Sequence, residues 1–223
     1  MAEGSSTCWT TVRGAARGDA RERDAFARNY LPVARAYLEA RWRGTALSQE
    51  VDDAIQEAFV DCFDERGALS RADTKRSFRG FFLGVLRIVA LRVEERGGRG
   101  SRTGRASTTF DVPDEEPALS EAFDRAWASS ILRQAAMRHE ERAAEEGEDA
   151  RRRLRLLRLR FQDDLPIREI ARRWQIPAER LHRDYARARR EFRSALMEVV
   201  GDHHPGSAAA VEAECGRLLD FFV

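Results

Sequence analysis

The residues best suited to chemistry lie between Asp164 and Phe192, where a run of arginines follows a turn between two amphipathic patterns. In the first pattern, apolar residues recur at i, i+3, i+4 and i+7, which is the spacing of one helix face; they are Ile167, Ile170, Ala171 and Trp174. Pro177 can end this helix and open the next, whose predicted buried stripe is Leu181, Tyr185, Ala188 and Phe192. The pattern is typical of a helix-turn-helix, which places its second helix in the DNA major groove.

Outside that buried stripe, the second helix carries mostly basic side chains. Guanidinium groups bind phosphates and guanine edges, so these side chains predict contact with DNA. The residues predicted to make that contact are Glu179, Arg180, His182, Arg183, Arg187 and Arg190. The alternative interpretation is a pair of amphipathic helices whose basic face is simply solvated.

Charge is segregated along the chain, although the formal net charge of the 223 residues is only +1. Residues 151–193 hold 15 arginines and 6 acidic residues, a local net charge of +9. Residues 111–124 hold 6 acidic residues and no basic one. This segregation predicts one surface for DNA and another segment that avoids or mimics it.

Several other classes of function are not favoured. Cys8, Cys62 and Cys215 are odd in number and widely spaced, which argues against a disulfide framework or a structural zinc site. His203 and His204 lack an evident third metal ligand and are expected in a solvated loop. We see no phosphate-cradling glycine loop and no nucleophile–base arrangement, so neither an enzyme nor a cofactor is predicted. The sequence shows no signal peptide and no stretch able to span a membrane, which predicts a cytoplasmic protein.

Helical patterns cover the chain, and no alternating strand pattern is present. In the first hundred residues we expect a helix capped by Asp19 and running to Asn29, a second opened by Pro32, a third capped by Ser48 and a fourth starting near Lys75. Residues 65–74 are expected to form a loop. Helices resume near Ala118, break at Gly147 and end with a short helix over residues 208–222.

The predicted fold is therefore all-α, with two helical domains joined by a flexible linker and a helix-turn-helix in the C-terminal domain. The predicted boundaries place a first helical domain at 9–97, a linker at 98–117, the helix-turn-helix domain at 118–200 and a C-terminal extension at 201–223. The linker begins with a glycine- and arginine-rich run and continues with acidic residues and proline.

Three motifs, in order, resemble an RNA polymerase sigma factor of the bacterial extracytoplasmic-function type. They are D-A-I-Q-E-A-F at 53–59, F-R-G-F-F-L-G-V-L-R at 78–87 and L-R-F-Q-D-D-L-P-I-R-E-I-A at 159–171. The resemblance covers most of residues 10–197. The run F-D-R-A-W-A at 123–128 and the C-terminal helix look like a subgroup found beside serine/threonine kinases.

The resemblance implies a transcription initiation factor that binds core RNA polymerase and reads the −10 and −35 promoter elements. Its first domain would meet the β′ clamp helices through Asp53, Gln56 and Glu57, and its second would meet the β flap. The residues implied at the −10 element are Arg66, Arg71, Lys75, Arg76, Arg79 and Arg87. The −35 element would be read by residues 178–190. An anti-sigma factor or a serine/threonine kinase is a further candidate partner.

Some residues depart from the family pattern. Phe81 stands where tryptophan is common, Ile88 where asparagine is common, and Gln175 where the turn usually has glycine. Phe78, Phe81 and Phe82 could stack on bases, but their helical spacing favours a place in the core. Two alternatives stay open: a dimeric helix-turn-helix regulator, and a sigma-like regulatory interaction protein without promoter-opening activity.

Overall fold

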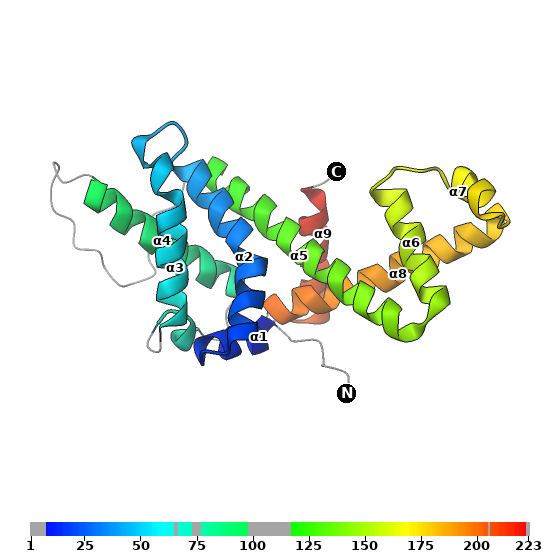
Figure 1. Cartoon of the computed structure of the whole chain (residues 1–223), viewed down its shortest axis with the longest axis horizontal. Helices are drawn as coiled ribbons and strands as arrows, with labels where there is room; N and C mark the ends of the chain where they lie inside the picture. Colours follow the sequence, from blue (N-terminus) through cyan, green and yellow to red (C-terminus); the bar gives the residue numbers. More distant parts are fainter. Residues whose placement is uncertain (1–7, 65–66, 73–76, 98–116, 205, 222–223) are drawn as a thin grey trace. The chain divides into compact units, whose positions relative to one another are not determined.

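The computed structural model describes residues 8–64, 67–72, 77–97, 117–204 and 206–221 (Figure 1). Every regular element in these ranges is a helix, and none is a strand, which confirms the all-α class. The helices pack into two compact units, and each is described by itself. Unit 1 comprises residues 1–130 and 200–223, and unit 2 comprises residues 131–199. In the described parts of the chain, no helix has both the length and the apolar character needed to cross a membrane.

This division differs from the predicted domain bounds. The first part of α5 (Pro117–Glu146) belongs to unit 1, because Phe123 and Trp127 are buried there. Residues 200–223, predicted as a separate extension, also belong to unit 1. They include α9 (Ala208–Asp220), in which Val211, Cys215 and Leu218 are buried. Residues 98–116 of the predicted linker lie outside the described residues.

Unit 1 is a bundle built around a cluster of packed aromatic side chains. Its remaining elements are α1 (Cys8–Ala16), α2 (Ala20–Arg41), η1 (Ala46–Glu50), α3 (Val51–Phe63), η2 (Leu69–Arg71) and α4 (Phe78–Gly97). Phe26 of α2 lies with its ring centroid 4.7 Å from that of Tyr30 and 6.0 Å from those of Phe78 and Phe82. All four rings are buried, and such tilted or edge-on pairs add to the stability gained from burial alone.

The helix α2 begins where predicted, after Asp19, but it continues to Arg41 and does not end at Asn29. The Asp19 side chain accepts hydrogen bonds from the backbone N–H groups of Arg21 and Glu22, which confirms it as the helix cap. Pro32, predicted to open a new helix, lies inside α2. Proline removes one helix hydrogen bond, but Pro32 is on the exposed side, where water can bind the freed carbonyl group. The buried face continues past it from Tyr30 to Tyr37.

Two other predicted helix starts are corrected. Ser48 does not cap α3, since it lies within the 3₁₀ turn η1, and α3 begins at Val51 after Glu50. The helix expected from near Lys75 begins at Phe78. From there, Phe78, Phe82, Leu86, Val89 and Val93 are all buried at spacings of three and four residues, as one helix face requires.

The end of α8 (Ala178–His203) also differs from the prediction. Residues 201–203 were expected in a solvated loop, but they continue the helix, and His203 is buried in unit 1. Its Nε2 atom lies 2.8 Å from the Tyr30 hydroxyl oxygen. The ring of Trp127 meets that of His203 edge-on at 5.5 Å. His203 is thus a polar part of the core.

Unit 2 contains the rest of α5, α6 (Glu148–Phe161), α7 (Ile167–Trp174) and α8 up to residue 199. Gly147 separates α5 from α6 with a φ of 96°, which confirms the predicted break. Leu156, Ile167, Ile170 and Leu181 form one buried cluster that joins α6, α7 and α8. The predicted apolar face of α7 therefore meets the first part of the predicted face of α8, Leu181 and Tyr185, in a shared core.

Candidate nucleic-acid interface

The outer face of α8 carries a stripe of arginines. Leu181 and Ala188 are fully buried on the inner face. Arg180, Arg183, Arg187 and Arg190 follow one another at i, i+3, i+7 and i+10, so they share one face of the helix, and all four are exposed. We call these four residues the arginine stripe. Glu179 and His182 are exposed beside it, so the structure brings all six predicted DNA-contacting residues onto the exposed part of one helix.

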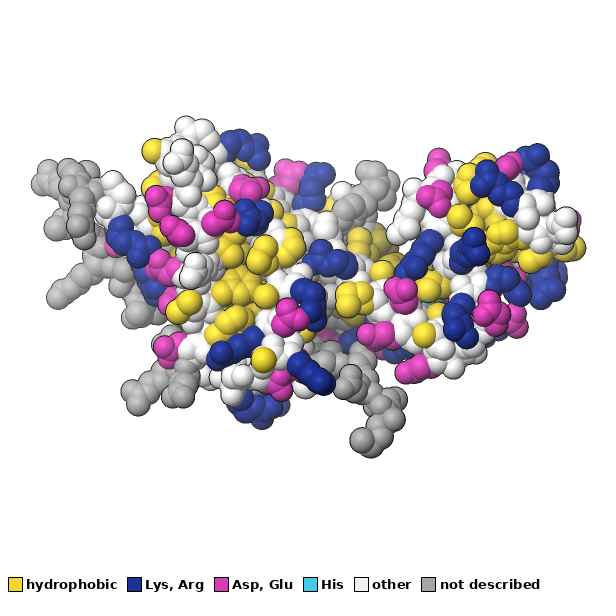
Figure 2. Space-filling view, viewed as in Figure 1, with side chains coloured by type: hydrophobic (Ala, Val, Ile, Leu, Met, Phe, Trp, Pro, Cys, Tyr) yellow, Lys and Arg dark blue, Asp and Glu magenta, His cyan; other side chains and the backbone are white. Residues whose placement is uncertain are grey.

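Three members of the stripe have no side-chain partner among the described residues, unlike most other arginines of unit 2. Elsewhere, Arg142 bonds to Glu198, Arg158 to Glu140 and Arg160 to Asp164 at 2.7–2.9 Å. Within the described part of the chain, the side chains of Arg180, Arg183 and Arg190 form no hydrogen bond, ion pair or ring contact. The same is true of Arg168 in the first turn of α7. Arginine side chains are visible over α7 and the adjoining start of α8 (Figure 2).

Arg187 is the member of the stripe with an internal partner. Its Nε group donates a 3.0 Å hydrogen bond to Glu191. Glu191 also accepts hydrogen bonds of 2.9 and 3.1 Å from Arg153, which is only 5% exposed. Burial alone would raise the pKa of Glu191, but the hydrogen bonds from these arginines outweigh that effect and lower it. Glu191 therefore stays ionised, and its hydrogen bond fixes the position of the Arg187 side chain.

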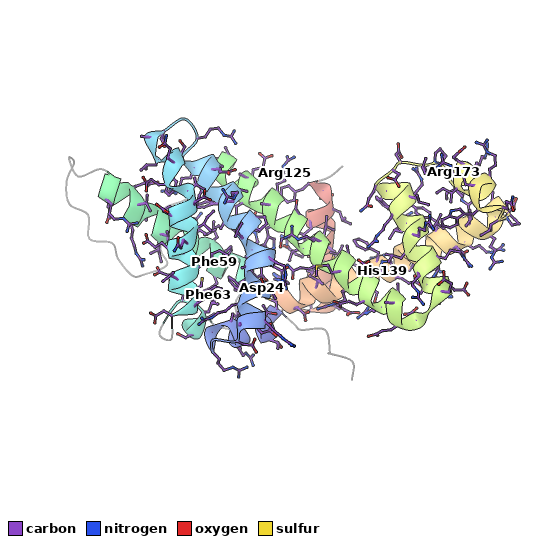
Figure 3. The ribbon with its side chains drawn as sticks, viewed as in Figure 1. Asp24, Phe59, Phe63, Arg125, His139 and Arg173 are labelled. Atoms are coloured by element: carbon purple, nitrogen blue, oxygen red, sulfur yellow. The ribbon has the colours of Figure 1, made fainter. Side chains whose placement is uncertain are left out.

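A buried histidine adjoins this ion pair. His139 of α5 is 3% exposed, and its Nε2 atom lies 3.8 Å from a carboxylate oxygen of Glu191 (Figure 3). Among the described residues, neither ring nitrogen has a hydrogen-bond partner. Burial lowers the pKa of His139, against the opposing attraction of Glu191. The histidine is therefore held in its neutral form under the stripe.

The turn before α8 contains a non-glycine residue in the left-handed conformation that favours glycine. Gln175 adopts a left-handed conformation, with φ 55° and ψ 39°. The backbone N–H groups of Gln175 and Ile176 both bond to the carbonyl oxygen of Ala171, which closes the end of α7. A left-handed glutamine is strained, because its Cβ crowds the backbone. Gln175 therefore has a backbone conformation that glycine adopts with less strain.

The residues predicted to face a polymerase lie on α3 but are not equivalent. Asp53 and Gln56 are exposed. Glu57 is half-buried and forms ion pairs with Arg92, at 3.5 Å, and with Arg96. Val60 was not predicted here, yet it is 60% exposed on the same face, four residues after Gln56. Its helical spacing from Asp53 and Gln56 could have placed Val60 on this face from the sequence alone.

The structure describes only two of the six side chains predicted for the −10 element, those of Arg79 and Arg87. Arg66, Lys75 and Arg76 lie outside the described residues, as does the side chain of Arg71. Arg79 donates a 2.9 Å hydrogen bond from Nε to Asp124 of α5, and Arg87 is half-buried on α4.

The aromatic residues of α4 are positioned by the core. Phe78 and Phe82 are fully buried, which confirms packing as their role. Phe81 is half-buried, with its ring centroid 5.9 Å from that of Phe78. None of these three phenylalanines is therefore fully exposed for stacking on a base.

The three cysteines are free and buried. Burial raises the pKa of the Cys8 and Cys62 thiols to about 12, which disfavours the reactive thiolate. No group of three metal-ligating side chains occurs in the described ranges. Comparison with protein-family models and with curated proteins found no match to this chain. A functional assignment therefore depends on the residues and their geometry.

Proposed function

We propose that this protein is a transcription initiation factor of the extracytoplasmic-function sigma type. It would bind core RNA polymerase through unit 1 and promoter DNA through α8. The observation that carries the proposal is the arginine stripe, opposite the buried face of a helix that follows a tight left-handed turn. We propose a sigma factor in particular because the motifs at 53–59, 78–87 and 159–171 resemble those of that family.

The pairing of the arginines supports a DNA partner. An arginine already held by a carboxylate must break that ion pair before it binds a phosphate. Arg180, Arg183 and Arg190 have no such partner in the described part of the chain, so their guanidinium groups can bind an anion without that loss. An α-helix fits the major groove, and its positive N-terminal end adds to the attraction for phosphate. We therefore expect the first half of α8 to contact DNA.

The exposed face of α3 supports a protein partner for unit 1. Asp53 and Gln56 have no side-chain partner among the described residues, so they can accept hydrogen bonds from a basic helix, and Val60 offers an apolar contact beside them. Charge complementarity of this kind mainly sets partner choice and association rate. Glu57 would have to release Arg96 before contributing. Asp53 and Gln56 are thus the stronger candidates for binding the polymerase.

The stripe gives a direct test of DNA binding. We expect the double variant Arg180→Gln/Arg183→Gln to bind duplex DNA roughly tenfold more weakly, because it removes two unpaired cations from the binding face. The slope of log K against log salt concentration should also fall by about 0.9 for each lost phosphate contact. Filter binding or fluorescence anisotropy with the full chain measures both quantities.

Arg151→Gln is the matched control, since Arg151 is exposed in unit 2 but lies on α6, where it pairs loosely with Glu148 at 3.6 Å. If the double variant bound DNA like this control, with the same salt dependence, α8 would not be the DNA-binding helix.

One observation favours the alternative of a sigma-like regulatory protein that does not open promoters. Arg79, predicted to hold the −10 strand, is occupied by Asp124. If that contact were permanent, α4 would lack one of the cations needed for strand capture. Potassium permanganate footprinting of thymines in a polymerase–promoter complex separates the two functions. Reactive thymines indicate promoter opening, and their absence from a bound promoter indicates the regulatory alternative.

A further inference from the structure

The first half of α5 is fixed in the core of unit 1. Phe123 is fully buried and meets Tyr37 edge-on, with ring centroids 6.3 Å apart. Trp127 stacks on Tyr30 at 5.8 Å with an interplanar angle of 16°. One turn later, the Ser130 hydroxyl donates a 2.6 Å hydrogen bond to the backbone carbonyl of Asn29. These contacts hold this part of α5 against α2.

That placement brings a carboxylate onto a predicted nucleic-acid-binding arginine. Asp124 accepts a 2.9 Å hydrogen bond from the Nε group of Arg79 and a second bond from its Nη2 group. The Arg79 guanidinium also lies over the Phe123 ring, 5.6 Å from the centroid. Both bonds converge on the single oxygen Oδ1, and one anionic oxygen of a phosphate could make the same charge-assisted contact with this guanidinium. Asp124 belongs to the acidic segment 111–124, which contains no basic residue.

We propose that Asp124 is an internal phosphate mimic that occupies Arg79, and that single-stranded promoter DNA binds α4 by exchanging a phosphate for the Asp124 carboxylate. This inference rests on the proposed function. The exchange moves side chains only, because Phe123 and Trp127 are buried and keep α5 in place. The ion pair itself is partly exposed, with 34% of the Arg79 side chain and 24% of the Asp124 side chain accessible, so water can stabilise the separated charges. Asp124 thereby regulates access to Arg79.

The exchange has a consequence for salt dependence. When a phosphate binds a free arginine, DNA releases condensed counterions, and the affinity falls with salt. In the wild-type protein, the same step breaks the partly exposed Arg79–Asp124 ion pair, which salt weakens by screening. The two effects oppose each other, so the contact made by Arg79 adds little to the net salt dependence. Without the Asp124 charge, the Arg79 contact should add its full share to the slope of log K against log salt. That share is about 0.7 per phosphate contact for a single strand.

The test measures binding of a fluorescein-labelled single-stranded oligonucleotide to the full chain by anisotropy over a range of salt concentrations. We expect Asp124→Asn to bind roughly threefold more tightly, the change associated with one partly exposed ion pair. Its slope of log K against log salt should be steeper by about 0.7. Glu121→Gln is the control, because it removes the same charge from an exposed pair with Arg125 on the same helix (Figure 3).

Three results would overturn the inference. In the first, Asp124→Asn and Glu121→Gln bind the strand alike. In the second, the gain survives in Arg79→Gln/Asp124→Asn, which shows that Arg79 is not its source. In the third, neither the wild type nor Asp124→Asn binds single strands at all. A wild type that supports transcription while Asp124→Asn behaves like the control would remove this inference and leave the proposed function intact.

A second variant decides the matter if Asp124→Asn does not fold. In Arg79→Gln, strand binding neither breaks the ion pair with Asp124 nor makes the phosphate contact of Arg79. We therefore expect weaker strand binding with an unchanged salt slope. A slope that falls by about 0.7 would instead mean that Arg79 meets DNA as a free cation, with no exchange.

Discussion

The most consequential single residues in unit 2 are charged or polar side chains that lie inside it. Arg153 and His139 approach Glu191 from α6 and α5, and Glu191 holds Arg187 on the outer face of α8. Arg153 and Glu191 are separated by 38 positions in the sequence, so helical spacing could not reveal their pairing. Sequence alone could place Arg187 outside the buried stripe, but it could not show that Arg187 is anchored while Arg180 and Arg183 are free.

The buried His139 predicts how stability depends on pH. The folded protein lowers the pKa of His139 from its ordinary value of 6.5, whereas the unfolded chain restores that value. Below about pH 6.5, the unfolded state therefore binds a proton that the folded state resists, and stability is lost as the pH falls. The charged groups that act on His139 are Glu146 and Arg142 of α5 and Glu191 of α8. Arg153 of α6 is bonded to Glu191.

As the pH falls below about 6.5, we expect the free energy of unfolding to decrease less in His139→Gln than in the wild type. Urea unfolding between about pH 5 and pH 7.5 gives the two curves, and their difference removes the contribution of the carboxylates that both proteins share. Parallel curves would show that His139 does not titrate differently in the folded and unfolded states.

Among the elements, the helices around the arginine stripe were the most predictable. Ile167, Ile170 and Leu181 recur at helical spacing and are buried as expected. The helix starts in unit 1 were less predictable. Pro32 and Ser48 carry ordinary start signals, yet tertiary packing continues α2 through the first and places the second in a 3₁₀ turn. Local signals set the position of a helix end only when burial of the neighbouring residues agrees with them.

The turn between α7 and α8 predicts a stabilising substitution. Gln175→Gly should raise the free energy of unfolding by roughly 0.5–1 kcal/mol, because glycine removes the Cβ crowding of the left-handed conformation but loses more entropy on folding. Gln162→Gly is the matched control, since Gln162 caps the end of α6 in a right-handed conformation, with φ −90°. The control should destabilise the protein. Urea denaturation of both variants measures the difference, and equal effects would refute strain at Gln175.

For the molecule as a whole, the all-α class was predictable and the division into units was not. The sequence shows a polar, glycine-rich run at 97–104 and a basic helix pair, which suggest a boundary between them. Helix patterns do not reveal that Phe123, Trp127 and His203 share an aromatic core with Tyr30 and Phe78. That core places the start of α5 and residues 200–223 in unit 1. It also brings Asp124 to Arg79 and so alters the expected −10 surface.

In vitro transcription with core RNA polymerase and a library of genomic promoter fragments is the decisive test of the proposed function. We expect the full chain to bind the core enzyme and to produce transcripts with defined start sites that are absent without it. Arg180→Gln/Arg183→Gln should weaken initiation at those promoters, while Arg151→Gln should not. Core polymerase that neither binds the chain nor starts at any new site in its presence would contradict the assignment as a transcription initiation factor.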